Sequence, residues 1–263
     1  MNQMLNQQLK QIELQEQKIF DQAKHGILEA TLTPMLDKLQ DKIPDKLIKT
    51  LNTAFYKGFQ LVFDKGSTYI EKTYNKDKIE LEYDINNYAL DKRMNKRHFN
   101  RLDQYSKQTK LINSSFSVLE GSVLGILGIG IPDIPLLLAV LVKTIYEIAL
   151  SYGYSYDKAE EKAYLLLLIN AAITKGELQM DLDKKLEQLS DKLDHNIETN
   201  TDMDTQMKET SKALSDALLT SKFIQGIPIV GIVGGAVNYS IVNRVAKYAR
   251  LKYKKRYLLN KLI

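Results

Sequence analysis

Residues 157–173, DKAEEKAYLLLLINAAI, decide the fold that we expect for this chain. One face of the expected helix carries Ala163, Leu166, Leu167, Asn170 and Ala171, and much of the remaining circumference is covered by Tyr164, Leu165, Leu168 and Ile169. A helix that is apolar on so many sides has to be enclosed by other helices. The segment therefore predicts an all-α protein with a central helix at this position.

The composition supports one large helical domain. The chain has 263 residues, 44% of them hydrophobic, with only five prolines and 13 glycines to interrupt helices. The absence of cysteine excludes a disulfide framework, a thiolate metal site and a cysteine nucleophile. We predict an N-terminal amphipathic helical extension over residues 1–41 and a single multi-helix domain over residues 42–263.

Helical spacing of apolar residues continues outside the central segment. A helix over 46–63 should end at Gly66, and 69–92 should be helical although Ile79, Leu81 and Tyr83 alternate as in a strand. In the final helix, Lys252 and Arg256 lie on the apolar side, so we expect its last two turns to be less buried. The further helices that we predict cover residues 1–24, 93–117, 134–150, 181–193 and 208–219, with the final one starting near 237.

Two glycine-rich apolar segments, 121–142 and 223–237, stand out as central parts of the domain. Prolines interrupt both of them, so neither can span a bilayer as one helix. Each has two glycines four residues apart, which would let two helices approach closely. We predict that the segments pack together through these glycines, with a leaflet-inserted hairpin or ordinary core glycines as alternatives; the four are Gly121, Gly125, Gly231 and Gly235.

Charge is concentrated in two blocks. Residues 181–204 carry a net charge of −5, residues 244–263 carry +8, and the rest of the chain sums to +2. Interleaved tyrosines and bases in the second block suit an anionic membrane surface or an acidic partner, whereas the acidic block would repel nucleic acid. A solvated basic face on a structural helix is the alternative. The predicted contact residues are Arg244, Lys247, Arg250, Lys254 and Lys255.

Asp133 is the candidate polar site, because it lies among apolar residues and prolines where an unpaired carboxylate would be costly to bury. It suits the N-cap of the following helix, and a ligand-binding or catalytic role is the alternative. We assign no catalytic residue, no metal and no cofactor, since the three histidines have no metal-ligand spacing. Lys143 and Glu147, one helical turn apart, are expected to form a local ion pair.

Three motifs resemble the EcsC family of bacterial proteins. They are GSVLGILGIGIPDIP at 121–135, YEIALSYGYSYDKAEEKAYLLLLI at 146–169, and IPIVGIVGGAVNYSIVNRVAKYARLKYKKRYL at 227–258. The resemblance implies an accessory protein linked to an ABC transporter, because the family takes its name from a gene that shares an operon with transporter genes. It implies no reaction.

We therefore expect a cytoplasmic protein that associates peripherally with an anionic membrane surface and works as a lipid-binding or accessory protein, with a membrane transporter complex as a partner. The N-terminal 24 residues contain no apolar run typical of a secretory signal. Two other functions stay open at this point: a hydrolase-like enzyme centred on Asp133, and a membrane-perturbing toxin or effector.

Overall fold

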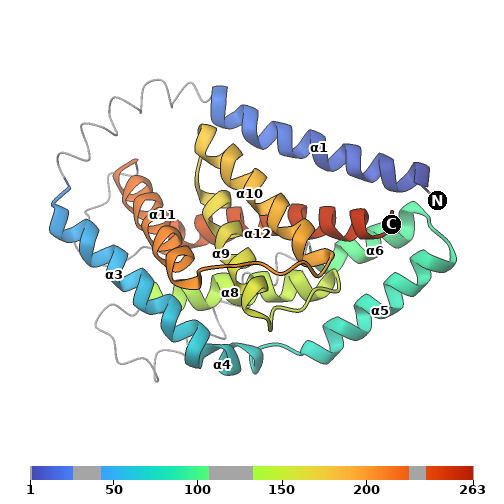
Figure 1. The fold of residues 1–263 in the computed structure, drawn as a ribbon, viewed down its shortest axis with the longest axis horizontal. Helices are drawn as coiled ribbons and strands as arrows, with labels where there is room; N and C mark the ends of the chain where they lie inside the picture. Colours follow the sequence, from blue (N-terminus) through green and yellow to red (C-terminus); the bar gives the residue numbers. More distant parts are fainter. Residues whose placement is uncertain (1, 26–42, 107–132, 225–234, 263) are drawn as a thin grey trace.

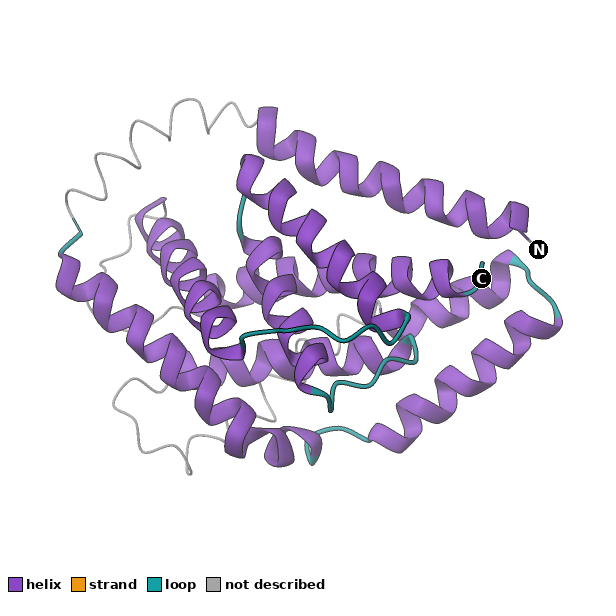
Figure 2. Cartoon of the chain, in the orientation of Figure 1, coloured by secondary structure: helices purple, strands orange, loops and turns teal. Residues whose placement is uncertain are grey.

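The computed structural model describes residues 2–25, 43–106, 133–224 and 235–262, and within these ranges the regular structure is helical throughout (Figures 1 and 2). The all-α prediction is confirmed. The helices are α1 (Asn2–His25), α3 (Asp45–Leu61), the π-helical turn η1 (Val62–Gly66), α4 (Ser67–Glu71), α5 (Lys76–Lys92), α6 (Lys96–Ser106), α8 (Asp133–Ser151), α9 (Ala159–Ile173), α10 (Gly176–Asp194), α11 (Met203–Ile224) and α12 (Gly235–Asn260).

Helices α8, α9 and α12 form the centre of the described structure. Helix α9 contacts α10, α11 and α12, while α8 contacts α12, α3 and α5. Every residue of α9 from Ala163 to Ile173 is buried, so the predicted central helix is confirmed. In Figure 1, α3, α4 and α5 run around the lower edge of this centre, α6 turns back toward it on the right, and α1 lies across its upper side.

Helix α8 is enclosed by the others. Its segment Ile134–Ser151 is long and apolar enough to cross a membrane by length and composition, but all of that segment is buried inside the protein. Burial of this kind is the behaviour of a core helix. The predicted pair of Lys143 and Glu147 forms within it, with 3.2 Å between Nζ and Oε2.

The C-terminal turns of α12 correct one expectation. They were predicted to be less buried, yet Lys252 and Arg256 are only 2% and 3% exposed, and the neighbouring Tyr253, Tyr257 and Leu258 are buried as well. The reason is that carboxylates from other helices neutralise the two cations, as described below. Sequence spacing on one helix contains no information about such partners.

Gly66 does not end a helix as predicted. The chain turns through η1 and continues as α4 to Glu71, and Gly66 itself has right-handed helical angles (φ −78°, ψ −26°). The conformational freedom of this glycine is therefore not used. Residues 76–92 are helical, in agreement with the prediction that favoured a helix over a strand there. The Asn75 side chain caps α5 by accepting a hydrogen bond from the Lys78 amide at 2.9 Å.

Several predictions fall on residues outside the described ranges. Gly121, Gly125 and Gly231 are among them, as is the predicted domain boundary at residue 41. Gly235 is the first residue of α12 and Asp133 the first residue of α8, but their surroundings are also outside the description. The glycine packing, the Asp133 cap and the domain division stay predictions, although α8 and α12 themselves do pack together.

Candidate functional site

Two adjoining hollows lie along α12. The first, of about 370 Å³, lies where the α9–α10 turn meets α12 and α1, and we name it the α10 hollow. The second, of about 480 Å³, lies between α1, α6 and α12, and we name it the α6 hollow. Ile19 and Lys247 line both hollows, so together they form one continuous surface, the basic groove.

The described lining of the basic groove is strongly cationic. Its seven basic residues come from four helices or their caps, and the only carboxylate among the described lining residues is Asp103. Asp103 is buried and forms an ion pair with Lys254 at 2.6 Å. The groove therefore keeps a large excess of positive charge; its basic residues are Lys18, Lys96, Lys175, Arg244, Lys247, Arg250 and Lys254.

Helical spacing explains how α12 supplies four of these cations. Arg244, Lys247, Arg250 and Lys254 recur every three or four residues and line the groove, while Val242, Val245 and Ala249 are buried in the core. Four of the five predicted contact residues thus lie together. The other three groove lysines come from α1, α6 and the start of α10, and no pattern within α12 could have indicated them.

Two of the α12 cations are positioned by the surrounding fold. The Arg244 guanidinium donates from Nη2 to the Thr174 carbonyl at 2.9 Å, which ties α12 to the turn before α10. Burial lowers the pKa of Arg250, while Tyr152 and Asp103 raise it. An arginine remains protonated under such a shift, so Arg250 contributes positive charge to the groove.

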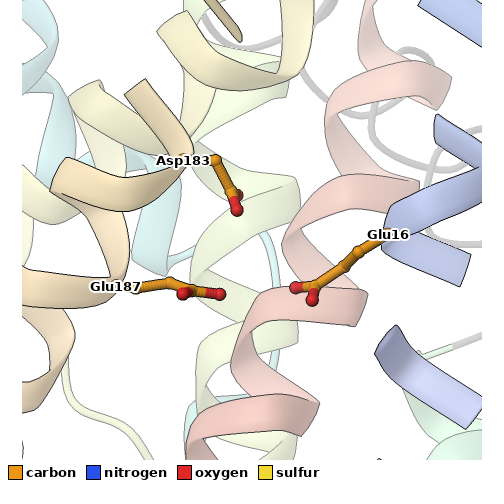
Figure 3. Close-up of side chains that lie close together, drawn as sticks. All are labelled: Glu16, Asp183 and Glu187. Atoms are coloured by element: carbon orange, nitrogen blue, oxygen red, sulfur yellow. The ribbon is translucent and has the colours of Figure 1, made fainter. Parts of the chain in front are cut away.

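Lys255, the fifth predicted contact residue, lies away from the groove in a carboxylate cluster formed by Glu16, Asp183 and Glu187. Figure 3 shows the three carboxylates, from α1 and α10, converging on one place beside α12. The Lys252 ammonium lies 2.5 Å from Glu16, 2.5 Å from Asp183 and 3.2 Å from Glu187. Lys255 lies 2.9 Å from Glu16 and also pairs with Glu187.

The carboxylate cluster has the donor chemistry of a cation site. Ligand oxygens of its three acids lie within 4.8 Å of one another, as metal binding would require. However, the Lys252 ammonium contacts all three carboxylates and so takes the position that a metal ion would need. We interpret the carboxylate cluster as an internal ion-pair network that fastens α1 and α10 to α12.

Burial and charge act against each other in this cluster. Burial alone would raise the pKa of Glu187, but Lys252 and Lys255 outweigh it and the pKa is lowered. The pKa of Lys255 is raised, although burial opposes this, because Glu187 and Glu16 stabilise its ammonium form. The network therefore favours the ionised state of both partners.

Arg256 makes a second internal network. Its guanidinium donates to both oxygens of Glu161, at 3.1 and 2.9 Å, and to Asp194 at 2.6 Å. It also stacks over Tyr154 and Tyr164, with 4.2 and 4.6 Å to the ring centres. The two charge blocks of the sequence thus neutralise each other in part, because Asp183, Glu187 and Asp194 belong to the acidic block.

A third hollow, of about 330 Å³, lies between α9, α10 and the end of α12. Its described lining contains equal numbers of basic and acidic residues: Lys252, Lys255 and Arg256, and Glu187, Asp191 and Asp194. This hollow offers no net attraction for an anion, in contrast to the basic groove.

Comparison with known proteins identifies relatives along nearly the whole chain. The EcsC protein family matches residues 6–258. The chain is 26% identical over 250 residues to Protein EcsC of Bacillus subtilis (strain 168), a match that covers 94% of each sequence. No solved structure matches. The family match spans the three motifs that suggested it, together with most of α1 and the described lining of the basic groove, and the chain belongs to the EcsC protein family.

Proposed function

We propose that this EcsC-family protein is an accessory or binding protein that docks reversibly on the cytoplasmic, anionic surface of a membrane through its basic groove. The observation that supports this proposal is the lining of the groove, seven basic residues against a single carboxylate among the residues described. Family membership leads us to propose an ABC transporter complex as the partner at that surface.

The expected strength of docking follows from the exposed cations. Lys18, Lys96, Lys175 and Lys247 are exposed, whereas Arg244, Arg250 and Lys254 are partly buried. Each basic residue near an anionic leaflet contributes about 1 kcal/mol, so four give about 4 kcal/mol. This corresponds to a dissociation constant of about 1 mM, so docking through the groove alone would be weak, reversible and sensitive to salt.

The internal ion pairs limit which cations can take part. Lys252, Lys255 and Arg256 are held by carboxylates from α1, α9 and α10, so the charge of +8 in the C-terminal block overstates what a membrane would meet. Three further lysines from other elements, Lys18, Lys96 and Lys175, also line the groove and contribute positive charge to it. The proposed surface is therefore a tertiary feature and not a property of α12 alone.

Co-sedimentation with vesicles tests the proposal. We expect the protein to sediment with phosphatidylglycerol-containing vesicles at low salt and to be released at about 0.5 M salt, where the screening length is only a few ångströms. Replacing Lys18, Lys96 and Lys247 together by glutamine should abolish sedimentation. The matched control replaces Lys46, Lys49 and Lys57, which are exposed on α3 outside the groove, and should leave sedimentation unchanged.

Two results would contradict the proposal. Absence of sedimentation by the unmodified protein at low salt would remove the membrane surface as a partner. An equal loss of sedimentation in the triple variant of the groove and the triple variant of α3 would show that net charge matters and the groove does not.

A DNA duplex of similar charge density, added as a competitor, should not displace the protein from vesicles if lipid is the preferred partner.

A further inference from the structure

We infer that the α10 hollow is a specific subsite for a phosphomonoester group, and that its ligand is the headgroup of a lipid such as phosphatidic acid. This inference rests on the proposed function and deepens it, because it assigns one part of the basic groove to one chemical group. Docking on a charged surface needs no defined pocket, whereas recognition of a phosphomonoester does.

The charges around the α10 hollow match a doubly charged group. Lys175, Arg244 and Lys247 line it, and no carboxylate occurs in the part of its lining that the structure describes. A phosphomonoester carries a charge of about −1.5 to −2 at pH 7, while a phosphodiester carries only one negative charge. Three cations that line one hollow suit the monoester better than the diester. The α6 hollow differs, because Asp103 lies in its wall.

The backbone adds to this preference. Lys175 is the N-cap residue of the 19-residue helix α10 and lines the hollow together with Gln179. The positive end of the helix dipole therefore lies at the wall of the hollow, where it favours an anion. Glu177 belongs to the first turn but is not among the lining residues.

Hydrogen bonds fix the wall of the hollow. Arg244 is anchored on the Thr174 carbonyl at 2.9 Å, and the buried Gln179 side chain donates to the Ala171 carbonyl at 3.0 Å. An arginine held in this way presents its planar fork in a defined direction, which suits a phosphate group. The site is therefore arranged before a ligand arrives, which reduces the entropic cost of binding.

The size and the uncharged wall indicate a headgroup. A volume of about 370 Å³ lies at the small end of the range of about 300 to 1,000 Å³ for ligand pockets. Ile19, Ala172 and Tyr248 complete the lining, and the Tyr248 hydroxyl is engaged by Asp183 outside it. Such a space accommodates a phosphate with a glycerol unit, which is the headgroup end of phosphatidic acid.

Soluble probes test the subsite without a membrane. We expect glycerol 3-phosphate and inorganic phosphate to raise the melting temperature of the protein and to bind in calorimetry. Lys175→Gln, at an exposed position, and Arg244→Gln should each weaken the binding of glycerol 3-phosphate by about tenfold or more, because each removes a charge-assisted contact. Lys96→Gln, in the α6 hollow, is the control and should leave this affinity unchanged.

Vesicles test the source of the phosphate. At equal surface charge, vesicles with phosphatidic acid should bind more tightly than vesicles with phosphatidylglycerol, and Lys175→Gln should remove the difference. If both lipids bind alike and glycerol 3-phosphate does not bind, the subsite is refuted while the proposed function survives. If glycerol 3-phosphate binds through Lys175 but no vesicle does, the ligand is a soluble phosphate ester, and membrane docking is refuted instead.

Discussion

Gly153 and Gly176 are the two described glycines with left-handed backbone, at φ of +82° and +66°. Gly153 closes α8, where its amide donates to the Leu150 carbonyl at 2.9 Å, and a side chain there would meet the Tyr83 ring at 2.2 Å. At Gly176, the first residue of α10, a side chain would meet nothing within 4 Å. The two sites therefore separate backbone strain from steric overlap.

We predict that Gly176→Ala lowers the free energy of unfolding by about 1 kcal/mol, the cost of left-handed backbone for an alanine. Gly153→Ala should cost about 2 to 4 kcal/mol, because overpacking against Tyr83 adds to the same strain. Urea unfolding followed by circular dichroism measures both. Tyr83→Leu should recover part of the loss in Gly153→Ala and none in Gly176→Ala; equal losses in the two alanine variants would mean that Tyr83 moves aside without cost.

At the scale of the element, α8 contains an ion pair in its buried middle. Lys143 and Glu147 are only 2% and 3% exposed, and the Lys143 ammonium also lies 5.7 Å from the centre of the Tyr74 ring. Burial raises the pKa of Glu147, although Lys143 opposes the rise. The charges are thus tolerated because each has the other, and neither would be favourable alone.

We predict that Glu147→Gln lowers the free energy of unfolding by about 3 to 5 kcal/mol, because it leaves a buried ammonium without its carboxylate. The double variant Lys143→Met with Glu147→Leu should be within about 1 kcal/mol of the unmodified protein or more stable, since apolar side chains fit the core of α8. Thermal and urea unfolding compare the three proteins. A double variant as unstable as Glu147→Gln would show that the pair itself is required for packing.

At the scale of the whole molecule, the sequence was informative about helices and uninformative about which helices meet. Periodicity predicted the central α9 and the face of α12 that carries Arg244, Lys247 and Arg250, because both depend on residues close in sequence. The carboxylate cluster joins Glu16 to Lys252 across 236 positions, a contact that only the tertiary fold creates. The acidic and basic blocks, with net charges of −5 and +8, were a signal that could have suggested this pairing.

The same network determines how the molecule should respond to acid. Glu187 bridges α10 to α12, and Lys252 and Lys255 lower its pKa below the ordinary value of 4.5 in spite of its burial. A carboxylate with a lowered pKa in the folded state stabilises the protein above its unfolded pKa, and this contribution is lost as the pH falls through the folded value. Protonation of Glu187 also removes one of the negative charges that pair with Lys252 and Lys255.

We therefore predict that the free energy of unfolding falls as the pH is lowered from about 5 toward 3, and that Glu187→Gln shows a shallower fall from a lower starting stability. Urea unfolding at a series of pH values measures both curves. Glu80→Gln, which removes an exposed carboxylate on α5, is the control, and its free energy of unfolding should match that of the unmodified protein at every pH. If the free energy of unfolding of Glu187→Gln fell with pH as steeply as that of the unmodified protein, Glu187 would not be responsible for the acid sensitivity. Other carboxylates would then have to cause it.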